Sequence, residues 1–169
     1  MKAYWDSSAL VQSLADTSLQ LRLQHDGGIT RKHALAETFS ALTGNPVTRI
    51  DTEDAVAFAA SLAEHLEFVE ITAADILTAL KTARKKGIRG GRVHDYLHAV
   101  AAEKSGAKTI LTLDKNDFAG ITPLTVEQAL TINIKPAVQV QKPGPTSFPF
   151  STPPWSLLAV RPVPLLTPA

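Results

Sequence analysis

The stretch Ala3-Tyr4-Trp5-Asp6-Ser7-Ser8-Ala9-Leu10 decides the fold, because it predicts a short apolar strand, one aspartate and then a helix. The aspartate stands where the strand ends, and a serine after it can cap the helix. In an open parallel sheet, ligands bind outside the carboxyl ends of the strands. The position of Asp6 therefore raises the question of which other acids reach the same edge.

Strands and helices alternate along most of the remaining chain. Apolar and β-branched runs predict strands at residues 68–71 and 109–113, and a short strand or extended segment at 29–30. Apolar periodicity predicts the helices, which are expected at residues 31–43, 51–65 and 92–105, and from Thr72 into the basic run that begins at Lys81. Val56 is expected on the core side of the helix at 51–65, and Leu77 and Leu80 on that of the helix after Thr72, where Thr72 and Asp75 match a capping box. A short strand or helix is expected at residues 125–130. This alternation predicts an α/β fold with a mostly parallel sheet covered on both faces.

The composition is that of a globular protein: 44% of the 169 residues are hydrophobic and 20% are charged. The absence of cysteine excludes disulfides, thiolate metal sites and a cysteine nucleophile. No stretch approaches the roughly 18–20 apolar residues of a membrane span, and no signal peptide is recognisable. We therefore expect a cytoplasmic protein without a membrane partner.

The composition changes near residue 135. Nine of the eleven prolines lie between Pro136 and Pro168, in a segment that carries no acid. Proline breaks helices and cannot donate to a strand ladder. We therefore expect a folded domain at residues 1–132 and a Pro-rich, disordered tail at residues 133–169.

Four acids predict a shared metal site when they are considered together. Asp6 and Asp114 follow apolar strands, Asp95 opens the helix before the second of these strands, and Glu37 interrupts an alanine-lined helix face. Each alone has an ordinary structural explanation, such as a helix cap, a turn or a solvated helix position. Together they would repel one another without a counter-ion, and oxygen ligands suit Mg²⁺ or Mn²⁺.

Four segments of the chain match, in the same order, the sequence pattern of a known protein family. They are residues 4–10 (YWDSSAL), 36–40 (AETFS), 89–102 (RGGRVHDYLHAVAA) and 111–118 (LTLDKNDF). The pattern resembles the PIN-domain nucleases, and within them the VapC-like toxins of prokaryotic toxin–antitoxin pairs. The resemblance covers residues 1 to about 130 and implies a PIN-like three-layer α/β/α sandwich.

The resemblance also implies a site and an activity. The acidic core would be Asp6, Glu37 and Asp95, with a fourth carboxylate from Asp114 or Asp117. We favour Asp114 as the inner metal ligand and Asp117 as its support, while Ser7 and Thr112 would orient carboxylates or water. These four acids would be both the catalytic residues and the metal ligands of an Mg²⁺-dependent endoribonuclease, with Mn²⁺ as the alternative metal.

The implied partners are RNA, a cognate VapB-like antitoxin and a second copy of the chain. Residues 81–92 hold six basic residues and no acid, and we expect Arg89 and Arg92 to hold the RNA backbone. The alternative for this run is a solvated helix end. The helices that contain Phe39, Phe58 and Leu62 are candidates for a homodimer interface.

Two other enzyme classes explain the sequence less well. The segment His94-Asp95-Tyr96-Leu97-His98 places two histidines four apart, as in zinc proteases, but no third ligand follows and three acids stay unexplained. An aspartate-nucleophile phosphatase needs an acid two residues after Asp6, where Ser8 stands. The remaining alternative is a PIN-like RNA-binding module, or a nuclease that acts on another nucleic acid without a toxin role.

Overall fold

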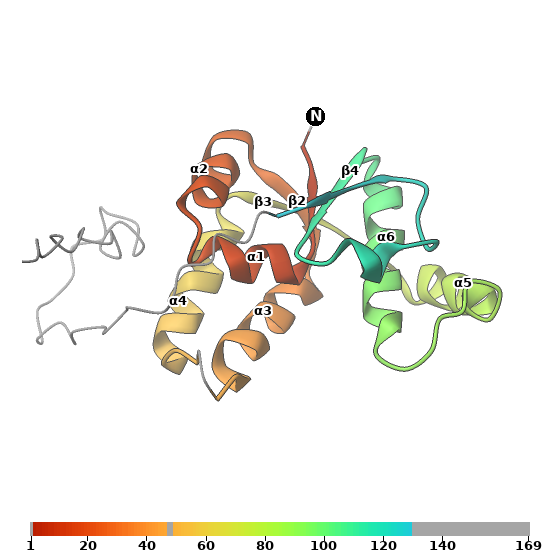
Figure 1. Ribbon diagram of the computed structural model, residues 1–169, viewed down its shortest axis with the longest axis horizontal. Helices are drawn as coiled ribbons and strands as arrows, with labels where there is room; N and C mark the ends of the chain where they lie inside the picture. The colour runs from red at the N-terminus through yellow and green to blue at the C-terminus, as the bar shows by residue number, and fades with distance from the viewer. Residues whose placement is uncertain (1, 47–48, 130–169) are drawn as a thin grey trace, which may run out of the picture.

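The centre of the molecule is a five-stranded sheet in which every strand pair is parallel. The computed structural model describes residues 2–46 and 49–129. The strands are β1 (Tyr4–Trp5), β2 (Gly28–Arg31), β3 (Leu66–Val69), β4 (Thr109–Thr112) and β5 (Thr125–Gln128), and they lie in the order β3-β2-β1-β4-β5 (Figure 1). The predicted parallel sheet is thereby confirmed.

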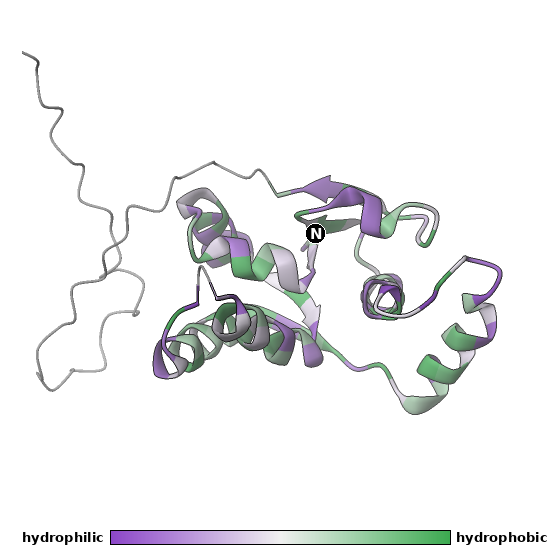
Figure 2. Cartoon of the chain, turned by 60° about the horizontal axis from the view of Figure 1, so that its bottom comes forward, coloured by the Kyte–Doolittle hydropathy of each residue, from purple (hydrophilic) through white to green (hydrophobic). Residues whose placement is uncertain are grey.

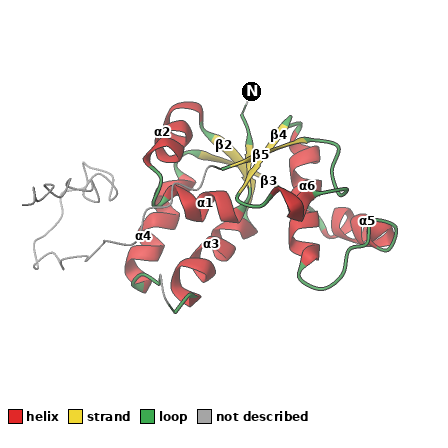
Figure 3. Cartoon of the chain, in the orientation of Figure 1, coloured by secondary structure: helices red, strands yellow, loops and turns green. Residues whose placement is uncertain are grey.

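Helices cover both faces of this sheet. They are α1 (Ser7–Ser13), α2 (Thr17–Asp26), α3 (His33–Gly44), α4 (Thr52–Ala63), α5 (Ala73–Ala83) and α6 (Arg92–Ser105), with a short 3-10 helix η1 (Lys115–Phe118). Helices α1 to α4 lie on one side, and α5 and α6 lie on the other (Figure 3). The three-layer α/β/α sandwich predicted from the sequence is therefore confirmed.

The first strand joins the two halves of the core. Successive strand residues point to opposite faces of a sheet, and both Tyr4 and Trp5 are almost completely buried. Trp5 packs in the cluster formed with α1 to α4, whereas Tyr4 packs in the cluster that contains Tyr96 of α6 and Ile110 of β4. A strand buried on both faces is expected to be apolar throughout, as this one is.

The order of the strands creates a switch point beside β1. The chain builds β1, β2 and β3 outward in one direction, and then crosses back to place β4 on the other side of β1. Trp5 pairs with Leu111, and the backbone N–H of Asp6 donates to the Leu111 carbonyl at 3.1 Å. Asp6 thus lies at the carboxyl edge of the sheet at the switch point, where α/β folds bind ligands.

Several element boundaries and buried faces differ from the sequence prediction, and the strand expected at residues 68–71 is Leu66–Val69. The helix expected from residue 31 begins at His33, because Arg31 is the last residue of β2. In α4 the expected core residue Val56 is 55% exposed, whereas Phe58 and Leu62 are buried. Both of those side chains are therefore part of the chain's own core and are not free for a dimer interface.

Helix α5 also turns a different face to the solvent than its sequence suggests. Leu77 and Leu80 were expected to point inward, but they are 60% and 43% exposed. Figure 2 shows the hydrophobic colouring of this helix at the edge of the molecule. The helix is held instead by Ala79, which is buried in the cluster that contains Tyr4 and Tyr96.

Some expectations lie at the limits of the described residues. The closing element expected at residues 125–130 is the edge strand β5. The predicted disordered tail at residues 133–169 lies outside the described residues, as does the end of the predicted domain. None of the helices within residues 2–46 and 49–129 is long and apolar enough to cross a membrane.

Candidate active site

Asp6 is fixed at the start of α1 by three hydrogen bonds to one carboxylate oxygen. Its Oδ1 accepts from the backbone N–H groups of Ser8 (2.6 Å) and Ala9 (3.0 Å), and from the Ser8 hydroxyl (2.6 Å). The side chain caps the helix and is only 5% exposed. Because all three bonds reach Oδ1, they orient the carboxylate without using Oδ2.

Ser8 connects this carboxylate to the neighbouring strand β4. Its hydroxyl accepts from the Leu113 N–H at 2.9 Å and lies 3.3 Å from the hydroxyl of Thr112. The buried Thr112 was expected to support the site, and its hydroxyl also receives the Asp114 N–H at 3.3 Å. The sequence argument named Ser7 as a support, but the hydroxyl that reaches Asp6 belongs to Ser8, one position later.

Asp95 and Asp117 lie in the same electrostatic environment as Asp6. Burial raises the pKa of Asp95, and the negative charges of Asp117 and Asp6 raise it further. Asp117 is exposed, and partial desolvation raises its pKa, with the charges of Asp114 and Asp6 as the next causes. We refer to Asp6, Asp95 and Asp117 as the acidic edge. Asp6 follows β1, Asp95 lies in the first turn of α6, and Asp117 lies in η1 after β4, and the charge of Asp6 acts on both other carboxylates.

Asp114, which was expected to be the inner metal ligand, lies at the start of η1. Its carboxylate caps η1, where Oδ1 accepts from the Asn116 N–H at 2.8 Å, and its side chain is exposed. Its charge raises the pKa of Asp117, so it lies near the acidic edge. Asp117 is exposed as well, so the expected order, with Asp114 as the inner metal ligand and Asp117 as its support, stays a prediction.

Glu37 of α3 is held by a buried polar chain. Arg31 donates through Nη2 to Oε1, and His98 donates from Nε2 to Oε2 at 2.7 Å. The other ring nitrogen of His98, Nδ1, lies 2.9 Å from the Tyr4 hydroxyl, so the ring bridges Glu37 and Tyr4. Arg31 and His98 are only 4% and 2% exposed.

These partners also set the charge state of Glu37. Burial raises its pKa, but the His98 hydrogen bond and the charges of His98 and Arg31 outweigh this effect and leave the pKa below its usual value. Glu37 is therefore an ionised carboxylate with both oxygens paired. Neither partner was predicted from the sequence, because Arg31 was expected in a helix and His98 was considered as a zinc ligand.

Of the two arginines expected to bind RNA, Arg92 acts on the acidic edge. Arg89 is exposed in the segment before α6, and Arg92 is the first residue of that helix. Arg92 donates to the Ala119 carbonyl at 3.0 Å, and its charge lowers the pKa of Asp117 against the other influences on that group. The basic run thus ends next to the carboxylates.

Comparisons with known proteins agree with the fold. A family model described as PIN domain matches residues 3–122. The crystal structure of PAE2754 from Pyrobaculum aerophilum is similar, with a TM-score of 0.56 and 19% identity over 75% of this chain and 89% of that chain. The structure of VapBC2 from Rickettsia felis bound to a DNA fragment from its promoter has a TM-score of 0.58 and 18% identity, covering 76% and 99%. No curated protein matches the chain.

Proposed function

Because the chain belongs to the PIN domain family, whose members are typically metal-dependent nucleases, we propose that it is an Mg²⁺-dependent endoribonuclease. The observation that carries the proposal is the position of Asp6 at the switch point of the sheet, where its charge raises the pKa of both Asp95 and Asp117. A nuclease needs a place where a cation and a phosphate meet, and this edge is the position at which such folds bind ligands.

The acidic edge suits a hard divalent cation. Its three side chains offer only carboxylate oxygens, which Mg²⁺ and Mn²⁺ prefer to nitrogen or sulfur ligands. Their mutual repulsion raises the pKa of Asp95 and Asp117, and a bound cation would relieve that repulsion. We therefore propose Asp6, Asp95 and Asp117 as the inner ligands and a supporting role for Asp114, the reverse of the order expected from the sequence for the last two.

The chain's own residues prepare the site for this chemistry. Ser8 fixes the Asp6 carboxylate before any substrate arrives, so little reorganisation is needed. When bound, Mg²⁺ acts as a Lewis acid that lowers the pKa of a water and stabilises charge on the phosphate. We propose that Arg92, whose charge lowers the pKa of Asp117, and the exposed Arg89 hold the anionic RNA backbone.

Glu37 receives a more limited role in this proposal. Both of its oxygens already accept hydrogen bonds, so binding the same cation as Asp6 would require it to leave Arg31 or His98 or to share an oxygen. We propose that Glu37 serves at the rim of the site, where it holds α3 against α6. Its assignment as a ligand of the catalytic metal stays a prediction.

The proposed partners follow from the family and its structural relatives. The solved Rickettsia felis structure contains VapBC2 and a DNA fragment from its promoter. We propose that this chain is likewise a toxin controlled by a VapB-like antitoxin and acts as a homodimer. For such a dimer, the exposed Leu77 and Leu80 of α5 are better candidates than Phe58 and Leu62, which are buried.

The proposal is tested by incubating the purified chain, freed of any antitoxin, with total RNA and Mg²⁺. Discrete fragments with 5′-phosphate ends are expected, and EDTA should abolish them. Asp6→Asn and Asp95→Asn should lower the rate at least about a hundredfold, because metal-centred stabilisation supplies several kcal/mol. Asp54→Asn, at an exposed position in the first turn of α4, is the matched control and should cut like the wild type.

Two outcomes would contradict the proposal. Cleavage that survives in Asp95→Asn would show that the acidic edge does not carry the activity. RNA binding without cleavage at any Mg²⁺ or Mn²⁺ concentration would favour the alternative function, a PIN-like binding module. Cleavage of DNA but not RNA would show that the chain is a nuclease whose substrate is DNA.

A further inference from the structure

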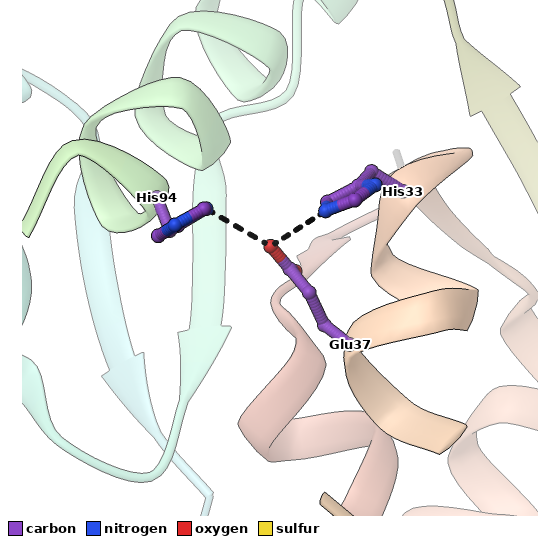
Figure 4. Close-up of side chains that lie close together, drawn as sticks. All are labelled: His33, Glu37 and His94. Atoms are coloured by element: carbon purple, nitrogen blue, oxygen red, sulfur yellow. Dashed lines mark ion pairs between the residues drawn. The ribbon is translucent and has the colours of Figure 1, made fainter. Parts of the chain in front are cut away.

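A second cluster of metal-type ligands lies beside the acidic edge. His33 on α3, Glu37 one turn later and His94 on α6 place one ligand atom each within 4.8 Å of one another. Figure 4 shows the Glu37 carboxylate oxygen between the two imidazoles, which approach it from different helices. Residues 2–46 and 49–129 contain only this one such trio. We call these three residues the His-Glu-His cluster.

The distances in the cluster are close to those of a metal site. Nε2 of His33 lies 3.9 Å from Oε1 of Glu37, and Nδ1 of His94 lies 3.6 Å from the same oxygen. Zinc bonds of about 2.0–2.1 Å place neighbouring ligand atoms of a tetrahedral site roughly 3.3 Å apart. The two imidazole–carboxylate distances therefore exceed this spacing by only about half an ångström, and the two imidazole nitrogens lie within 4.8 Å of one another.

The exposure of the side chains allows the cluster to contract. His33 and His94 are 60% and 57% exposed, so both rings can turn towards the carboxylate without disturbing the core. Their planes are nearly parallel, at 14°, with centroids 6.4 Å apart. The buried Arg31 approaches Glu37 from the protein interior, whereas the two imidazoles lie at its solvent side. Each carboxylate oxygen has a second lone pair for this outer position.

The ligand set selects a different metal from the one proposed for the acidic edge. Imidazole nitrogen suits zinc and neighbouring transition metals, whereas Mg²⁺ prefers oxygen ligands. Two histidines and one carboxylate are a common ligand set for such ions. The segment around His94 lacked a complete ligand set in the sequence, and His33 and Glu37 of α3 complete it. His98, the other histidine of that segment, points inward to Tyr4 and Glu37.

We propose that His33, Glu37 and His94 bind a transition cation of the Zn²⁺ class and thereby link the N-terminal ends of α3 and α6. The ion would sit at the rim of the site, separate from the Mg²⁺ at the acidic edge. Because α6 also carries Asp95, a cation bound by the cluster would fix the position of Asp95 relative to α3. The remaining coordination positions would be filled by water.

Calorimetric titration of the full chain with Zn²⁺, in the presence of excess Mg²⁺ and without RNA, tests this proposal. One Zn²⁺ per chain is expected. His33→Ala and His94→Ala should each weaken the Kd at least about tenfold, since losing even an outer partner of a metal ligand has that effect. His25→Ala removes an exposed histidine of α2 and should leave the Kd unchanged.

The outcomes separate this site from the proposed nuclease. Failure of the wild type to take up Zn²⁺ under these conditions would overturn the proposal, as would unchanged affinity in both His33→Ala and His94→Ala. Loss of affinity in His25→Ala but not in those two variants would place the ion elsewhere and would also overturn it. Because no RNA is present, none of these results bears on whether the chain cuts RNA.

Discussion

Gly28 begins β2 at a point where a side chain has no room. A Cβ atom there would lie 2.7 Å from Cδ1 of Trp5 and 3.0 Å from a methyl carbon of Leu23. Both neighbours are buried, so neither can yield easily. We predict that Gly28→Ala lowers the free energy of unfolding by about 1–3 kcal/mol, the usual effect of overpacking a core.

Urea denaturation measures this effect, and Gly44→Ala is its matched control. Gly44 ends α3, and a Cβ there meets no atom within 4 Å in the described part of the chain. Alanine is favoured over glycine in a helix by about 0.5–1 kcal/mol, so this variant should be neutral or slightly stabilised. Equal losses of stability in the two variants would contradict the steric explanation for Gly28.

Arg31 and Glu37 should behave as one unit. Removing one member of a buried ion pair costs about 3–5 kcal/mol, because the other charge is left unpaired. We predict that Arg31→Met lowers the free energy of unfolding by about 3 kcal/mol, towards the lower limit, since Glu37 keeps the His98 hydrogen bond. The double variant with Glu37→Gln should be less destabilised than the two single variants added together. Strict additivity would show that the pair is not coupled.

The polar chain around Glu37 also shows the limit of sequence reasoning for single residues. Asp6 and Asp95 could be predicted because each stands at the end of a strand or the start of a helix, where local pattern fixes the position. The contacts of His98 with Tyr4 and Glu37 join residues 94 and 61 positions apart. The periodicity of a local sequence cannot predict contacts between such distant residues. These contacts form only when the helices pack on the sheet.

At the scale of the element, α5 is fixed at its start by a capping box that the sequence predicted. The Thr72 hydroxyl accepts from the Asp75 N–H at 3.2 Å, and the Asp75 carboxylate accepts from the Thr72 N–H at 2.7 Å. Lys104 of α6 adds an ion pair at 2.6 Å. The hydrogen bond from Lys104, followed by those from Thr72, lowers the pKa of Asp75 to about 2.

This shift predicts the pH dependence of the cap. A carboxylate whose pKa is lowered on folding stabilises the folded state above its ordinary value of 3.8 and loses that contribution as the pH falls towards 2. The difference in unfolding free energy between wild type and Asp75→Asn should therefore be present at pH 7 and shrink below pH 4. Urea denaturation at both pH values measures it, and a difference that grows on acidification would contradict the assignment.

The faces of α4 and α5 could not be predicted as well as their existence. Both helices are rich in alanine and carry apolar residues around much of their circumference, so several stripes fit the helical period equally well. The structure buries Phe58 and Leu62 of α4 but exposes Val56, and it exposes Leu77 and Leu80 of α5. Which face turns inward depends on the neighbouring helices, and this information is not local.

For the whole molecule, the alternation of strands and helices was sufficient to predict the fold class. The parallel sheet follows from that alternation, and the three layers follow from the need to cover both apolar faces. The strand order β3-β2-β1-β4-β5 was not predicted, yet it places Asp6 beside the end of β4. The order is also what brings Asp117 and Asp95 to the same edge, from segments distant in sequence.

The measurement that tests the acidic edge most directly is an anomalous difference map from a crystal of the protein soaked in Mn²⁺. We expect a peak bound by carboxylate oxygens of Asp6, Asp95 and Asp117. The substitution Asp95→Asn should remove this peak. A peak confined to the His-Glu-His cluster, or no peak at these three carboxylates at saturating Mn²⁺, would contradict the account.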